Sequence, residues 1–329
     1  MLGKTEAEDF LIRRIRPGDT VDDLVRFPSF FEIETVNACN ARCPMCTIED
    51  WSRHSPTMKM PLFRKIADEI IEHAGHVRRV NLYRDGEPLL DKKLPDRLEI
   101  LKTGGVRETA ISTNVSLLDE ARSKALLEAG LDMVVLSIDS LKKDVFERIR
   151  ARLVFEEVMD NALRFIDLRN RIRPSTSIWM RMIRQQDNIG EWPAYRAFWA
   201  DKLSPNDRIM YHNIHNWGGQ LEGFKAIDGT HEVNLPCVAL WSLMVIFANG
   251  DVPNCNVDYN GKFPNGNIRD HSIQDIWQSR VIEQRRALHL GNRKAEMSIC
   301  AKCNVWDEPS DHEVPISSEY TEKVAVSGR

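Results

Sequence analysis

The chain has 329 residues, of which 42% are hydrophobic and 29% charged, and its formal net charge is −4. This balance is that of a globular protein with a sizeable core, and it gives no indication that nucleic acid or an anionic membrane is the main partner. No apolar run approaches the roughly 18 residues of a membrane span, and the N-terminus lacks the apolar segment of a signal peptide, so we expect a cytoplasmic protein.

Six predicted strands alternate with helices along the first two thirds of the chain. The strands are expected at residues 29–37, 78–84, 107–113, 132–139, 176–183 and 208–214, and the helices at residues 61–75, 92–105, 117–130, 154–169 and 191–202. This alternation indicates parallel βαβ units, and apolar strands such as "MVVLSI" are typical of a sheet covered on both faces. Because there are six units rather than eight, we expect an α/β fold with a partial (β/α)6 barrel; a flat doubly wound sheet is the alternative.

The regular alternation ends after Gly218 and Gly219. The rest of the chain is loop-rich in its sequence pattern and contains four of the seven cysteines. We therefore expect three parts: an N-terminal helical lead-in at residues 1–28, the partial barrel at 29–219, and a small C-terminal domain with its tail at 220–329.

Three cysteines crowd into the loop that follows the first predicted strand, with the spacing Cys39-x3-Cys43-x2-Cys46. In a reducing cytosol, such clustering indicates metal ligands or catalytic thiols rather than disulfides. A structural zinc site is normally closed by four protein ligands, and the next Cys or His is His54, in a predicted loop. A [4Fe–4S] cluster held by three thiolates instead leaves one iron open to an outside ligand.

The cysteine spacing resembles the signature of the radical S-adenosylmethionine (radical SAM) enzymes, and the resemblance covers roughly residues 30–215. It implies that SAM chelates the open iron through its amino and carboxylate groups. It also implies that an electron from the cluster cleaves SAM to methionine and a 5′-deoxyadenosyl radical, which abstracts hydrogen from the substrate. An external donor such as flavodoxin or ferredoxin would supply that electron.

Further segments match the family in order, each directly after a predicted strand. "YRDGEPLL" resembles the family's Gly-Gly-Glu-Pro loop, with Asp85 in place of the first glycine. The residues that the resemblance implies as SAM contacts are Gly86, Glu87, Ser112, Asn114, Ser137, Asp139 and Arg150. Each segment alone also fits a common turn or helix cap. Their shared position predicts that all of them lie at the C-terminal ends of the strands, where barrel active sites are found.

The other four cysteines have the spacing Cys237-x17-Cys255-x44-Cys300-x2-Cys303. Four thiolates are able to close a zinc site, which keeps a zinc-stabilised α/β binding protein as an alternative. However, "FANGDVPNCN", "GNIRDHSIQDIW" and "CAKC" resemble the C-terminal extension of radical SAM enzymes known as SPASM, in its shortened twitch form. This resemblance implies one fully ligated auxiliary [4Fe–4S] cluster, and therefore two [4Fe–4S] clusters per chain.

The twitch form points to enzymes of the 2-deoxy-scyllo-inosamine dehydrogenase type, from aminoglycoside antibiotic biosynthesis. The resemblance thus implies an oxidoreductase in which the 5′-deoxyadenosyl radical removes hydrogen from a carbinol carbon of a sugar or aminocyclitol. The auxiliary cluster would then accept an electron, and a ketone would be released. Since all seven cysteines are assigned to clusters, no thiol remains to quench a substrate radical. This disfavours an epimerase; epimerisation and peptide modification stay as alternatives.

Four further residues are expected to contact the substrate or move a proton, because they lie at or near the C-terminal ends of predicted strands: Tyr83, Arg181, His212 and His215. In an epimerase without a free thiol, a tyrosine such as Tyr83 or Tyr211 would donate the hydrogen. The alternative for each of the four is a structural role, with the side chain pointing outward or bonded to the backbone.

Overall fold

The computed structural model describes residues 4–53, 57–221, 235–303, 305 and 314–315. Its strands are β1 (Phe30–Ile33), β2 (Arg79–Asn81), β3 (Thr109–Thr113), β4 (Met133–Ser137), β5 (Ser177–Arg184), β6 (Arg208–Asn213), β7 (Leu243–Ile246), β8 (Asp251–Val252), β9 (Gly266–Asn267) and β10 (Val314–Pro315). Its α-helices are α1 (Lys4–Ile15), α2 (Val21–Leu24), α3 (Met60–Glu72), α4 (Leu94–Thr103), α5 (Glu120–Glu128), α6 (Lys143–Ile149), α7 (Phe155–Ile172), α8 (Trp192–Ala200), α9 (Ala239–Ser242), α10 (Ile273–Trp277), α11 (Arg280–Leu290) and α12 (Ser298–Ala301).

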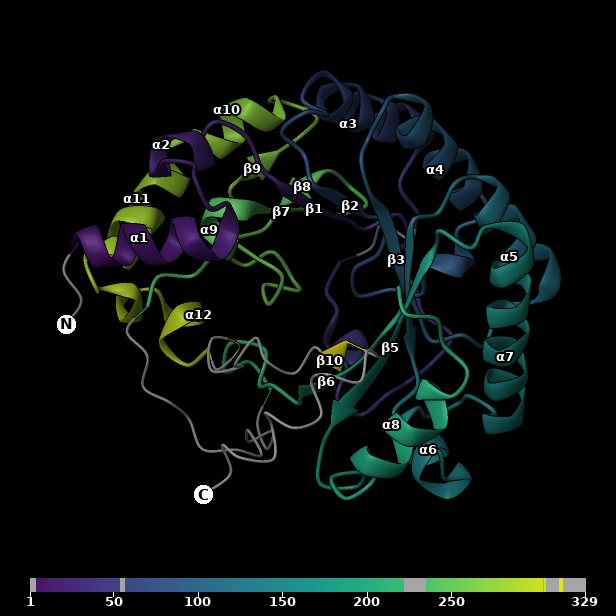
Figure 1. The fold of residues 1–329 in the computed structure, drawn as a ribbon. Helices are drawn as coiled ribbons and strands as arrows, with labels where there is room; N and C mark the ends of the chain where they lie inside the picture. Colours follow the sequence, from purple (N-terminus) through teal and green to yellow (C-terminus); the bar gives the residue numbers. More distant parts are fainter. Residues whose placement is uncertain (1–3, 54–56, 222–234, 304, 306–313, 316–329) are drawn as a thin grey trace.

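Eight of the strands form one sheet in the order β10-β6-β5-β4-β3-β2-β1-β7. All neighbours from β6 to β7 are parallel, and only β10 runs antiparallel, against β6. The strands follow an arc, and α3, α4, α5 and α7 lie along its outer side (Figure 1). The predicted partial barrel is therefore confirmed.

Two strands of the sheet, β7 and β10, come from outside the predicted barrel. β7 lies beyond residue 220 and pairs in parallel with β1, from Phe30↔Leu243 to Ile33↔Ile246. Its apolar sequence "LMVI" is too short to show a period, and its strand conformation depends on the partner that it meets. The helix α6, which ends directly before Arg150, was not predicted either.

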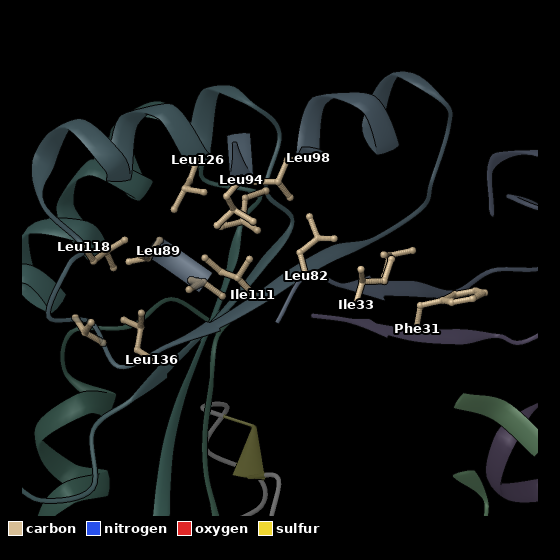
Figure 2. Close-up of a cluster of buried hydrophobic side chains, with 14 of the residues drawn as sticks. Phe31, Ile33, Leu82, Leu89, Leu94, Leu98, Ile111, Leu118, Leu126 and Leu136 are labelled. Atoms are coloured by element: carbon tan, nitrogen blue, oxygen red, sulfur yellow. The ribbon is translucent and has the colours of Figure 1, made fainter. Parts of the chain in front are cut away.

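Alternation along the strands gives the sheet an apolar side and a side with polar residues near the C-terminal strand ends. Farther from these ends, the second side carries a small apolar cluster of Ala110, Met133, Val135 and Trp179. Figure 2 shows Phe31, Leu82 and Ile111 facing the layer of helices, where Leu98 of α4 and Leu126 of α5 lie in the same core cluster. The side chains between these positions face the opposite way, into the arc. This concave side, rather than the helix-covered side, therefore carries the polar residues.

The N-terminal helices pack on the C-terminal part of the chain. Leu11, Ile15 and Leu24 form one cluster with Leu240 and Trp241, and Figure 1 shows α1 beside α9 and α11. The three-part division of the chain stays a prediction, and its second boundary adjoins residues 222–234, which lie outside the described part. Among the described helices, none is both long and apolar enough to cross a membrane.

Candidate active site

A cavity of about 280 Å³ lies at the C-terminal ends of the central strands. The predicted site residues that line it are Cys39, Cys43, Cys46, Tyr83, Gly86, Glu87, Ser112, Asn114, Ser137, Arg150, Arg181 and His215. Of the residues predicted to contact SAM or the substrate, two are not among the lining residues. Asp139 is buried behind Arg150, and His212 lies on β6 outside the lining set.

The loop after β1 brings three thiols to one wall of this cavity. The Cys46 N–H donates to the carbonyl of Cys43 (2.9 Å), which closes a tight turn. Nη1 of Arg150 lies 4.0 Å from Sγ of Cys43. The hydrogen bond from the Cys46 thiol and the Arg150 charge, against the opposing effect of burial, lower the pKa of Cys43 to about 6. The same hydrogen bond, together with burial, raises the pKa of Cys46, so the two thiols share one proton between them. Three thiols on one short loop suit the ligands of a cluster.

Gly86 allows the loop after β2 to approach the cysteine loop closely. A Cβ added at Gly86 would lie 2.3 Å from the carbonyl oxygen of Val36 and 2.7 Å from that of Ala38. The next residue, Glu87, donates its N–H to the same Ala38 carbonyl (2.8 Å). The two loops are thus joined through backbone, at a distance that only glycine permits.

We expect Gly86→Ala to lower the free energy of unfolding by about 1–3 kcal/mol, because backbone atoms must move to admit the methyl group. The displaced cysteine loop should also bind less iron after reconstitution. Denaturant unfolding and an iron count would measure the two effects. Gly75→Ala is the matched control, since nothing lies within 4 Å of an added Cβ there. Equal iron content in the two variants would contradict this expectation.

The carboxylate of Glu87 is surrounded by donors of the protein itself. It accepts hydrogen bonds from the Thr113 hydroxyl (2.7 Å), the Asn114 N–H (2.8 Å) and the Leu89 N–H (3.1 Å). Burial raises the pKa of Glu87 to about 7, although these donors oppose the rise. The side chain thus joins the loops after β2 and β3, and its contact with SAM stays a prediction.

Of the three arginines that line the cavity, Arg150 and Arg181 are the two expected from the sequence. Arg150 donates from Nε to Asp139 (2.5 Å), whose other oxygen accepts the N–H of Ile183 (2.8 Å). Although burial acts to lower the pKa of Arg150, the Asp139 carboxylate raises it, so the guanidinium stays charged. Arg181 donates from Nη2 to Ser112 and Ser137 (2.9 Å each), and no ion pair of Arg181 is present among the described residues.

A second cavity, of about 560 Å³, is lined by all four remaining cysteines: Cys237, Cys255, Cys300 and Cys303. Burial, and after it the charges of the other three cysteines, raise the pKa of Cys237 well above its usual value, so the four thiols lie near one another. Nevertheless, no three His, Cys, Asp or Glu side chains in the described ranges are spaced to hold a single metal ion. All four thiols line one cavity, which suits the four thiolate ligands of a fully ligated iron–sulfur cluster.

The two cavities share part of their walls. Glu32, Asn256, Val257 and Val305 line both of them. Glu32 points into the arc from β1, between the outward residues Phe31 and Ile33, and burial raises its pKa to about 7. Sequence reasoning missed Glu32, although the acidic residue within the apolar run "FFEI" is an available signal.

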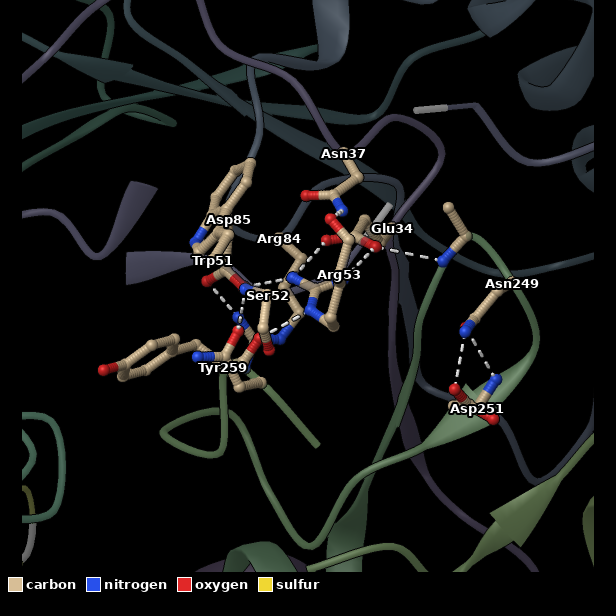
Figure 3. A network of polar contacts seen from close by, with 12 residues as sticks. Glu34, Asn37, Trp51, Ser52, Arg53, Arg84, Asp85, Asn249, Asp251 and Tyr259 are labelled. Atoms are coloured by element: carbon tan, nitrogen blue, oxygen red, sulfur yellow. Dashed lines mark hydrogen bonds and ion pairs between the residues drawn. The ribbon is translucent and has the colours of Figure 1, made fainter. Parts of the chain in front are cut away.

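A network of buried ion pairs, also missed, joins the cysteine loop to the C-terminal region (Figure 3). Arg53 donates to both oxygens of Glu34 (2.6 and 2.9 Å) and to Asp85 (3.1 Å). Asp85 also pairs with Arg84. From the C-terminal region, the Tyr259 carbonyl accepts Nε of Arg53 (2.6 Å). The position where the family motif has glycine therefore carries a carboxylate that connects two arginines.

Comparison with family models gives two matches along the chain. The model described as "Radical SAM superfamily" matches residues 33–183. A second model, described as "Iron-sulfur cluster-binding domain" and named SPASM, matches residues 237–304. The two matches separate the cysteines into the same two sets as the two cavities do.

Several characterised proteins are similar to this chain. A GTP 3′,8-cyclase of Chlorobaculum tepidum is 37% identical over 155 residues, which are 46% of this chain and 43% of that one, so the chain matches less than half of its length. The S-adenosyl-L-methionine-dependent 2-deoxy-scyllo-inosamine dehydrogenase of Niallia circulans is 24% identical over 84% of this chain and 92% of that one. The crystal structure of BtrN in complex with AdoMet and 2-DOIA has the same fold, with a TM-score of 0.59 and 21% identity over 87% of this chain and 98% of that one.

Proposed function

The chain belongs to the radical SAM superfamily and carries a SPASM-type region, and on this basis we propose that it is a radical SAM dehydrogenase. The proposed reaction oxidises a carbinol carbon of a sugar or aminocyclitol to a ketone. The similarity over nearly the full length to the Niallia circulans dehydrogenase supports this substrate class.

Each cysteine set fits one [4Fe–4S] cluster. Cys39, Cys43 and Cys46 would hold the first with one iron open, and the four cysteines of the second cavity would close the other. The residues proposed to hold SAM are Gly86, Glu87, Ser112, Asn114, Ser137 and Arg150, while Asp139, also expected from the sequence, holds Arg150 in place from behind the cavity wall. When bound, SAM and the first cluster would supply a 5′-deoxyadenosyl radical for hydrogen abstraction. The second cluster would supply an acceptor for the substrate's second electron.

The shared wall between the two cavities carries the proposal. A substrate at the first cavity would be separated from the second cysteine set only by residues such as Glu32 and Val257. Electron transfer out of the substrate needs such proximity. An epimerase has no use for it, because its substrate radical must regain a hydrogen atom. Tyr83 lines the first cavity and keeps epimerisation as the second candidate.

The polar side of the sheet provides the proposed substrate contacts. Arg181 and Tyr83 offer donors for hydroxyl groups of the substrate, and His215 lies in the same lining. Glu32 is able to accept the hydroxyl proton as the carbinol is oxidised, since burial raises its pKa to about 7. We therefore assign the role of base to Glu32, in place of the histidines expected from sequence.

Ketone formation should rise with pH, with a midpoint near 7, because Glu32 accepts a proton only when ionised and burial raises its pKa to about 7. Glu32→Gln should lower ketone formation at pH 8 by about 10²–10⁴-fold and remove this midpoint. His215→Gln is the matched control within the same lining and should keep it. A rate profile that loses its midpoint in the histidine variant instead would assign the base to His215.

The proposal as a whole is tested with anaerobically reconstituted protein and a panel of aminocyclitols and sugars. We expect about eight irons per chain, the sum of two four-iron clusters. One substrate should yield ketone and 5′-deoxyadenosine in equal amounts when a flavodoxin or ferredoxin supplies electrons. Solvent deuterium in the reacting carbon of the product would favour the epimerase. Colourless protein with zinc alone would favour a zinc-stabilised binding protein.

A further inference from the structure

One buried arginine, Arg84, lies where the two cavities meet. Its side chain is 2% exposed. It lines the first cavity together with Asn256 and Val257, which also line the second. In sequence it lies two residues before Gly86, so it belongs to the loop proposed to hold SAM. In space it reaches the loop of the auxiliary cysteines.

The contacts of Arg84 place its guanidinium beside the residue that follows Cys255. Nη2 donates to the carbonyl of Asn256 (2.6 Å), the residue directly after Cys255. Nη1 pairs with Asp85. The third donor, Nε, is buried without a hydrogen-bond partner among the described residues. Because buried donors are normally paired, this donor indicates that the site is built to face another polar group.

Arg53 is a natural comparison for Arg84 within the same network. Both are buried cations, both contact Asp85, and both lie near the ring of Phe247 (3.8 Å for Arg53 and 5.3 Å for Arg84, from the guanidinium carbon to the ring centroid). They differ in the backbone that they bind. Arg53 reaches Tyr259, whereas Arg84 reaches the residue next to Cys255.

A cation beside a cluster favours its reduced state. Reduction adds one negative charge to the cluster, and a nearby buried guanidinium is attracted to that charge through a medium that screens it weakly. Charge and hydrogen bonds around a cluster are known to set its reduction potential. Removing the cation should therefore lower the potential and make the cluster a poorer electron acceptor.

We propose that Arg84 is a positioning residue that raises the reduction potential of the auxiliary cluster and so directs the substrate's electron to it. The inference rests on the proposed two-cluster enzyme. It does not depend on which alcohol is the substrate.

The test is a redox titration of the reconstituted protein without substrate. The EPR signals of the two clusters report how much of each cluster is reduced at each potential. In Arg84→Gln, we expect the ratio of reduced to oxidised auxiliary cluster at a fixed potential to fall about tenfold, which is about 59 mV for a one-electron couple. Arg84→Lys keeps the charge and should keep most of the wild-type potential. Arg53→Gln loosens the same network and should shift the auxiliary cluster much less.

Three results would overturn the inference alone, while iron analysis still shows two clusters: an unchanged midpoint in Arg84→Gln, an equal shift in Arg53→Gln, or an equal shift in Arg84→Lys. Wild-type protein that holds only one cluster would overturn the proposed function, and this inference with it. If Arg84→Gln loses the EPR signal of the auxiliary cluster, its reduction potential is not measurable, and Arg84→Lys decides. The lysine variant must then retain both the signal and the wild-type potential.

Discussion

Replacing Cys43 by alanine is expected to abolish the cleavage of SAM. The three thiols of the loop after β1 lie on one wall of the first cavity, and Cys43 is the buried one, beside Arg150. A four-iron cluster with two protein thiolates should be lost or should fail to present its open iron in the correct place. The yield of 5′-deoxyadenosine should fall to the background of protein without iron, a loss of at least about 10³-fold by analogy with removal of other essential catalytic groups.

The matched control for this experiment is Cys303→Ala. It removes one thiol from the second set and leaves the first set intact, so some cleavage of SAM should remain. Iron analysis should show the loss of about four irons in Cys43→Ala, whereas Cys303→Ala keeps three thiolates in the second set and should lose iron only from that centre. A normal yield of 5′-deoxyadenosine from Cys43→Ala would refute the assignment of the first cavity.

Replacing Cys255 by alanine should separate the two halves of the proposed reaction. The first cysteine set is untouched, so cleavage of SAM should continue in part. The substrate, once it has lost hydrogen, would lack an acceptor for its second electron. We expect ketone formation to fall by about tenfold or more relative to 5′-deoxyadenosine, and the ratio of the two products is the measurement.

Damage to folding is the main alternative explanation for a loss of ketone, because a cluster held by four thiolates also stabilises the region around it. Circular dichroism and the iron content of the first centre control for this. If ketone and 5′-deoxyadenosine still form one for one in Cys255→Ala, the auxiliary cluster is not the electron acceptor.

The sequence predicted those features that depend on neighbouring residues. Strand and helix patterns predicted β1 to β6, and the two cysteine spacings predicted two groups that the structure places in two cavities. β7 was not predicted, because its place in the sheet depends on pairing with β1, more than 200 residues earlier in the chain. The pattern of apolar and polar residues within a short segment does not predict a pairing over such a separation.

The charged residues of the site were predicted only in part. The resemblance located Arg150, but not its buried ion pair with Asp139. Arg53 and Arg84 were missed because their network joins three distant segments and has no period in the sequence. The departure at Asp85, from glycine to a carboxylate, was visible, and its physical reason became clear only from the two arginines beside it.

The pairing of β7 with β1 has a consequence for how the molecule is made. During synthesis, β1 and the cysteine loop that follows it emerge early, but one edge of β1 stays unpaired until residue 246 has left the ribosome. Pairing of strands that are so far apart in the sequence is slow, and until it occurs the unpaired edge of β1 is able to pair with other chains. We therefore expect the first 219 residues, expressed alone, to give aggregated protein, and the soluble yield compared with that of the full chain measures this.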